Sequence, residues 1–185
     1  MANVLIVYAT KEGQTEKIAR RVAGTLAAAG HRAELVDADE VVTPLDLAHF
    51  QVAVVGGPIH VGGYPRSLVR FVREHRQFLE RVPSAFFSVG LAVESQTSDG
   101  RAQTLEVVER FVKRTGWRPG RVELIAGALP YSKYNFLIRF VMRRIAAKEG
   151  GDTDTSRDYE YTNWPSVERF ARELVENRSA AAARA

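Results

Sequence analysis

Residues 3–15 read NVLIVYATKEGQT, and this stretch decides the fold prediction. Its first part, NVLIVY at 3–8, is a near-continuous apolar run, which is typical of a strand buried on both faces of a parallel sheet. Its second part, ATKEGQT at 9–15, is a turn of small and hydroxyl-bearing residues with one glycine. Apolar side chains then recur at helical spacing from Thr15 to Ala29, so the stretch predicts a buried strand that turns directly into a helix.

The rest of the chain repeats this alternation of strand and helix. Apolar runs predict four further strands, at 32–36, 51–56, 84–90 and 121–128. Helical periodicity predicts helices at 15–29 with Gly30 as the stop, from Pro65 to about Leu79, around 105–112, and from about Trp164 to Glu176. Five strands that alternate with helices imply an α/β fold with a doubly wound parallel sheet covered on both faces.

The length of the chain suits one domain. A chain of 185 residues that is 45% hydrophobic can bury a full core. We expect this domain to span residues 1–176, followed by a frayed tail at 177–185. Residues 129–162 are too long for a plain strand-to-helix connection, so we interpret them as an insertion after the fifth strand begins.

Two absences narrow the chemistry and the location. The chain has no cysteine, which excludes disulfides, thiolate metal sites and dithiol redox chemistry. Any redox activity must therefore come from a bound cofactor, and we expect no metal. The N-terminus lacks the pattern of a signal peptide, and no apolar run approaches the roughly 18 to 20 residues of a membrane span. These observations favour the cytoplasm.

The turn at 9–15 has the composition of an anion site. Free backbone N–H groups at a helix N-terminus favour a phosphate, Thr10 and Thr15 add hydroxyl donors, and Gly13 permits a close approach. An ordinary strand-to-helix turn is the alternative. The glycine patterns of P-loops and of dinucleotide folds are both absent, so a phosphate here indicates a mononucleotide such as FMN.

Longer stretches then carry a family resemblance. Residues 5–15 resemble the phosphate loop of flavodoxin-like proteins. Four further stretches are similar to the menaquinone-dependent protoporphyrinogen IX dehydrogenase family of the flavodoxin superfamily: PSAFFSVGLA (83–92), GWRPGRVELIAGALPYSKYNF (116–136), GGDTDT (150–155) and YTNW (161–164). The similarity extends to about residue 176 and implies a flavodoxin-like sheet of order 2-1-3-4-5 with FMN across its carboxyl edge.

The resemblance also implies which residues hold the cofactor. The FMN phosphate would bind Thr10, Lys11, Glu12, Gly13, Gln14 and Thr15. The flavin ring would lie near Pro58, Ile59, His60, Val61, Gly62 and Gly63, near Ser88, Val89, Gly90, Leu91 and Ala92, and near Asp152, Thr153 and Asp154. We also expect Gly56, Gly57, Gly62 and Gly63 to let backbone amides approach the ring.

Several of these positions have a second interpretation. Lys11 either adds charge to the phosphate loop or is solvated. His60 either donates a proton or hydrogen bond to reduced flavin or faces solvent, so we assign no catalytic residue. The GGDTDT segment with Asp152 and Asp154 is either close to the flavin or a simple Asx turn.

The basic charge of the chain lies in the insertion. Residues 131–148 contain five basic side chains and no acidic one, and the net charge of the whole chain is +4, so the remainder carries −1. Exposed aromatic and arginine side chains on a predicted helix would suit an anionic membrane surface or a large acidic ligand. Burial of the phenylalanines by neighbouring loops is the alternative. Nucleic acid is disfavoured as a binding partner of this helix. The candidate rim residues are Tyr131, Tyr134, Phe136, Arg139, Phe140, Arg143 and Arg144.

The expected function follows from the resemblance and from this rim. We expect an FMN enzyme that oxidises protoporphyrinogen IX, a haem precursor, and passes electrons to a membrane quinone at the inner face of the cell membrane. A flavodoxin-like FMN electron carrier and an NAD(P)H:quinone reductase are the alternatives. Carrier flavodoxins are usually strongly acidic, which disfavours the first of these for a basic chain. The sequence does not indicate an oligomeric state.

Overall fold

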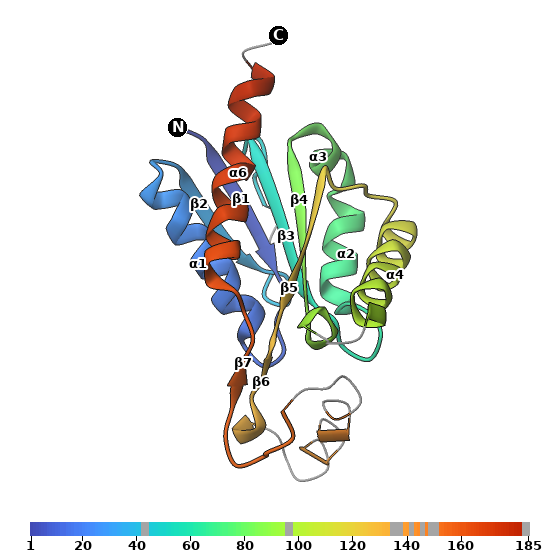
Figure 1. The fold of residues 1–185 in the computed structure, drawn as a ribbon. Helices are drawn as coiled ribbons and strands as arrows, with labels where there is room; N and C mark the ends of the chain where they lie inside the picture. Colours follow the sequence, from blue (N-terminus) through green and yellow to red (C-terminus); the bar gives the residue numbers. More distant parts are fainter. Residues whose placement is uncertain are drawn as a thin grey trace.

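The computed structural model describes residues 1–41, 45–94, 98–133, 139–140, 143–144, 147 and 152–182. Its centre is a five-stranded parallel sheet of order β2-β1-β3-β4-β5, which confirms the predicted topology (Figure 1). The strands are β1 (Asn3–Tyr8), β2 (Arg32–Asp37), β3 (Val52–Pro58), β4 (Ser84–Gly90) and β5 (Arg121–Ala126).

Helices cover both faces of this sheet. On one face α1 (Gln14–Ala28) and α6 (Trp164–Ala182) lie side by side (Figure 1). On the other face lie α2 (Arg66–Glu74), α3 (Arg76–Arg81) and α4 (Ser98–Thr115). Each layer has its own hydrophobic cluster, and the sheet separates the two.

Strand β1 contributes to both clusters in alternation. Val4 and Ile6 pack toward α1 and α6, whereas Leu5 and Val7 pack toward α2, and all four side chains are fully buried. This two-residue period is the geometry of an extended strand. It explains why residues 4–8 of this run are apolar, because neither face of the strand meets solvent there.

Element boundaries differ from the predictions at three places. The segment after Pro65 forms two short helices, α2 and α3, which meet at His75. The predicted strand 121–128 is interrupted at Gly127, between β5 and β6 (Ala128–Leu129). The last helix, expected to end at Glu176, extends to Ala182. Among the described residues, the helices lack the length and apolar character that crossing a bilayer requires.

A small second sheet forms the stem of the insertion. Strand β6 pairs in antiparallel fashion with β7 (Tyr159–Glu160). Two single-turn 3-10 helices lie nearby in the chain, η1 (Leu91–Glu94) after β4 and η2 (Tyr131–Lys133) after β6. The stem projects beyond the carboxyl ends of the main strands (Figure 1), so the two ends of the insertion are held together at that edge of the sheet.

The two glycines at the end of β3 have a packing role. A Cβ atom on Gly56 would overlap the ring of Phe87 on the neighbouring strand, and one on Gly57 would lie 2.5 Å from Leu68 of α2. Both residues are buried within β3. These contacts give both glycines a packing role in addition to the expected approach to a flavin ring, which stays a prediction.

We therefore expect Gly56→Ala to destabilise the fold by about 1–3 kcal/mol, the usual cost of overpacking a core. Gly24→Ala is the matched control, because Gly24 lies on the exposed side of α1 and an added Cβ has no neighbour within 4 Å. That change should stabilise the helix by about 0.5–1 kcal/mol. Urea unfolding measures both values, and equal midpoints for the two variants would contradict the packing role of Gly56.

Candidate functional site

The candidate site lies at the carboxyl edge of the sheet, where ligands bind in doubly wound folds. Four connections meet there: those that follow β1, β3, β4 and β5. They are joined by backbone hydrogen bonds, since Ala9 N donates to Gly56 O at 3.1 Å, Ile59 N to Val89 O at 2.8 Å, and Gly127 N to Gly90 O at 3.3 Å. Most of the predicted site residues are therefore brought together at this edge.

The turn after β1 is shaped as an anion site. Gly13 is the N-cap of α1 and adopts φ +95°, a conformation that favours glycine. Its N–H donates to Thr10 Oγ1 at 3.0 Å. The first helical hydrogen bond runs from Lys17 N to Gly13 O at 3.1 Å, so the amides of residues 14–16 precede the helical ladder and point toward the turn. These amides and the helix dipole suit a phosphate.

The side chains of the turn differ in exposure. Thr15 is buried at the base of the turn, Lys11 is exposed, and Glu12 is half-buried. The exposure of Lys11 matches the solvated alternative for this residue. The turn thus offers its anion mainly backbone groups and the Thr10 hydroxyl.

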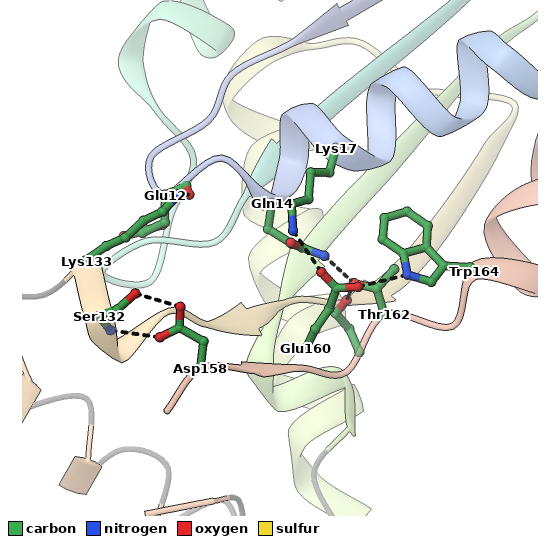
Figure 2. Close-up of polar contacts among 10 residues, drawn as sticks. Glu12, Gln14, Lys17, Ser132, Lys133, Asp158, Glu160, Thr162 and Trp164 are labelled. Carbon is green, nitrogen blue, oxygen red and sulfur yellow. Dashed lines mark hydrogen bonds and ion pairs between the residues drawn. The ribbon is translucent and has the colours of Figure 1, made fainter. Parts of the chain in front are cut away.

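The stem of the insertion supports the turn from below (Figure 2). Gln14 Nε2 donates to Thr162 Oγ1 at 2.9 Å, and Thr162 Oγ1 donates to Ala126 O at 2.7 Å. Lys17 Nζ lies 3.1 Å from Glu160 Oε2. The other oxygen of Glu160 accepts a hydrogen bond from Trp164 Nε1 at 2.8 Å.

Sequence reasoning missed this support. Its residues lie more than 140 positions from the turn, with a separation of 148 between Gln14 and Thr162 and 143 between Lys17 and Glu160. The available signal was the YTNW stretch at 161–164, which contributed to the family resemblance without an assigned role. Local patterns cannot pair residues so far apart in the chain.

The turn after β3 is strained. His60 and Gly63 pair across it, with His60 N donating to Gly63 O at 2.8 Å. Between them, Val61 has φ +49° and Gly62 has φ +73°, as in the tight turns of hairpins. Val61 is β-branched, which makes a positive φ costly, and its side chain is 95% exposed. Strain of this kind gathers at functional sites, where a ligand contacts the residue.

His60 itself is exposed. This placement matches the solvent-facing alternative, and we assign the residue no chemical step. Pro58 is buried in β3 and Ile59 is half-buried against Gly90.

Residues 88–92, the third segment predicted to lie near the flavin ring, divide into a buried part and a half-buried part. Ser88 and Val89 are buried inside β4, and Ser88 Oγ accepts a hydrogen bond from Tyr64 OH at 2.7 Å. Burial raises the pKa of the Tyr64 hydroxyl well above its ordinary value, so this pair is neutral and structural. Gly90, Leu91 and Ala92 are half-buried at the carboxyl edge. Among residues 88–92, Gly90, Leu91 and Ala92 are therefore the ones that are accessible at this edge.

Two tyrosines and Asp152 close the base of the insertion. Tyr131 is fully buried, and its hydroxyl donates to Asp152 O at 2.9 Å. Tyr161 OH donates to Asp152 Oδ2 at 2.8 Å. Burial, together with this carboxylate, raises the pKa of Tyr161 to about 12. Tyr131 therefore lies in the interior of the insertion base rather than on an exposed rim.

The neighbouring Asp154 makes a local turn. Its carboxylate accepts hydrogen bonds from Ser156 Oγ at 2.7 Å and Ser156 N at 3.0 Å, which lower the pKa of Asp154. Thr153 is exposed. These contacts match the Asx-turn alternative for the GGDTDT segment.

Part of the predicted rim can be located. Phe140 is 52% exposed, and Arg143 and Arg144 are exposed. Arg139 is half-buried. Tyr134 and Phe136 lie outside the described residues. Phe140, Arg143 and Arg144 are thus exposed, and their role as a rim stays a prediction.

Comparison with known proteins identifies the family. The model of the flavodoxin domain matches residues 5–156. The chain is 35% identical over 171 residues to protoporphyrinogen IX dehydrogenase [quinone] of Escherichia coli K12, covering 92% of this chain and 93% of the relative. It is 32% identical over 172 residues to the protein of the same name from Leishmania major, covering 92% of this chain and 74% of the relative.

Solved structures support the fold. A short-chain flavodoxin associated with a PDU bacterial microcompartment has a TM-score of 0.55 at 17% identity, with 96% of this chain and 99% of that chain covered. Flavodoxin 1 from Bacillus cereus has a TM-score of 0.53 at 12% identity, with 95% and 98% covered. A flavodoxin domain implies a flavin cofactor. The chain belongs to the flavodoxin-domain family and, within it, to the family of the quinone-dependent protoporphyrinogen IX dehydrogenases.

Proposed function

We propose that this protein oxidises protoporphyrinogen IX to protoporphyrin IX with FMN as its cofactor and a quinone as electron acceptor. The observation that carries the proposal is similarity to enzymes of that name along 92% of the chain, the insertion included. The order and geometry of the turns at the carboxyl edge support the same activity.

The residues present fit FMN. The amides of residues 14–16 and the hydroxyl of Thr10 surround a position at the positive end of α1, which suits a phosphate group. Gly13 places no side chain of its own there, and its φ of +95° favours glycine. The turn at 60–63 and the segment 90–92 would flank the flavin ring. FMN bound there would supply the redox chemistry, taking electrons from the porphyrinogen in two-electron steps and giving them to the quinone.

The role of the protein residues is then to position the cofactor and the substrate. The backbone of the turn after β1 fixes the phosphate, and the strained Val61 offers an apolar surface for a flat ring or for the substrate. No covalent nucleophile is required, because the electrons move through the cofactor. His60, the titratable residue of the turn after β3, lies exposed at its start.

The rim of the insertion would bind an anionic partner. Arg143 and Arg144 supply positive charge, and the exposed ring of Phe140 supplies an apolar contact. The propionates of the porphyrinogen and the headgroups of an anionic bilayer both fit this chemistry. Because a quinone acceptor resides in the membrane, we place the protein peripherally at the cytoplasmic face.

An electron-carrier flavodoxin is the second candidate, favoured by the structural similarity to flavodoxins. The net charge of +4 disfavours it, because carriers of this fold use acidic surfaces to meet basic partners. An NAD(P)H:quinone reductase is a third outcome of the assay below.

The activity can be tested directly with the FMN-loaded protein. Protoporphyrinogen IX is added without oxygen, with and without menadione, and porphyrin fluorescence is followed. We expect quinone-dependent formation of protoporphyrin above the rate without enzyme. Tight FMN binding without porphyrin formation would refute the dehydrogenase and leave the carrier, while menadione reduction in a parallel reaction with NAD(P)H in place of the porphyrinogen would identify the reductase.

The phosphate position is tested with Gly13→Asp. The added carboxylate would face the phosphate at the N-terminus of α1, so we expect FMN to bind at least about tenfold more weakly. Gly30→Asp is the matched control, because Gly30 also has a positive φ, at +81°, but lies beyond the opposite end of α1. Quenching of flavin fluorescence measures both affinities. Equal loss in the two variants would show that the effect is one of folding rather than of the phosphate.

Membrane association is tested with Arg143→Glu combined with Arg144→Glu. This reversal should abolish binding to vesicles that contain anionic lipid, because each basic residue near such a surface contributes about 1 kcal/mol. Lys113→Glu with Arg114→Glu changes the net charge equally in the last turn of α4, at the opposite edge of the sheet. Co-sedimentation with vesicles separates the two cases, and unaltered sedimentation of the first variant would contradict the role of the rim.

A further inference from the structure

A lysine of the insertion lies against the phosphate turn. Lys133 is the last residue of η2, and its Nζ donates a hydrogen bond to Glu12 O at 2.8 Å across 121 positions of the chain (Figure 2). A Cβ atom added to Gly13 would lie 3.6 Å from the same Nζ. The ammonium group therefore lies beside the Glu12–Gly13 peptide, at the entrance to the turn.

The backbone that carries this lysine is well anchored. Both carboxylate oxygens of Asp158 accept hydrogen bonds from Ser132, from its N–H at 2.8 Å and from its hydroxyl at 2.6 Å. These bonds, together with the nearby charge of Lys133, lower the pKa of Asp158. Lys133 N donates to Pro130 O at 2.9 Å, and the adjacent Tyr131 is fully buried. The lysine thus projects from a fixed turn rather than from a free loop.

The charge of Lys133 has the Asp158 carboxylate nearby, but it also lies at the positive end of a helix dipole. The N-terminus of α1 carries the positive end of the helix dipole, so a cation placed beside Gly13 is repelled. Two charged residues at the start of α1 are in ion pairs: Glu16 lies 2.7 Å from Arg20, and Lys17 lies 3.1 Å from Glu160. Lys133 instead contacts a neutral carbonyl oxygen. A group with two negative charges at the turn would convert this repulsion into attraction.

We propose that Lys133 is a direct ligand of the phosphate group that binds at the turn formed by residues 10–15. The insertion then completes the phosphate site, and a side chain from outside the flavodoxin phosphate loop supplies its cation. This inference rests on the proposed FMN site and adds a residue to it. It predicts that the contribution of Lys133 depends on the phosphate and not on the flavin ring.

The test compares two ligands that differ only in the phosphate. FMN carries it and riboflavin does not, and quenching of flavin fluorescence gives the dissociation constant of each. Lys133→Met should weaken FMN binding about tenfold, as expected for the loss of a hydrogen bond between charged groups. Riboflavin affinity should change less than about twofold, and Lys133→Arg should retain most of the FMN affinity. Lys113→Met in α4 is the control for the loss of one positive charge.

The outcomes separate this inference from the proposed function. If wild-type protein binds FMN more tightly than riboflavin and Lys133→Met leaves both constants unchanged, the inference is wrong and the FMN site stands. Equal weakening of both ligands also overturns it, because the lysine would then act through the fold. If the wild-type protein binds no FMN, the proposed function fails together with the inference.

Discussion

Burial of β1 on both faces is the constraint on which the rest of the structure depends. The strand lies between β2 and β3, and its side chains enter two separate hydrophobic clusters in alternation. A shift of one residue would exchange the two sets of side chains, so the register is strongly determined. Because β1 is fixed in this way, the turn at its carboxyl end and the N-terminus of α1 are fixed with it, and these form the candidate phosphate site.

The insertion is part of this site rather than an appendage to it. Its stem, β6 with β7, contacts the first turn of α1 through Glu160 and Thr162, and η2 contacts the turn itself through Lys133. The contacts of Lys17 with Glu160 and of Lys133 with Glu12 are exposed, whereas Thr162 is buried, and each polar contact of this kind contributes modestly to stability. Their main effect is to hold the two ends of the insertion at the carboxyl edge of the sheet, next to the candidate phosphate site.

The insertion and the rest of the domain differ in net charge. The segment 131–148 holds five basic residues, and the remainder of the chain has a net charge of −1. The protein surface is therefore not uniformly basic, and an anionic ligand or membrane would be attracted toward the insertion. The same segment brings Lys133 to the phosphate turn and Arg143 and Arg144 to the proposed rim.

The sequence by itself determined the fold class, the strand order through the family resemblance, and the phosphate turn, because each depends on local patterns such as the apolar run NVLIVY and the Gly13 turn. It did not reveal the packing role of Gly56 and Gly57, and it gave no role to Glu160, Thr162 or Lys133. Only the tertiary structure decided these, since the ring of Phe87 and the stem of the insertion reach their partners from distant parts of the chain. Contacts between residues so far apart produce no periodic pattern in the sequence, so only the three-dimensional packing of the chain determines them.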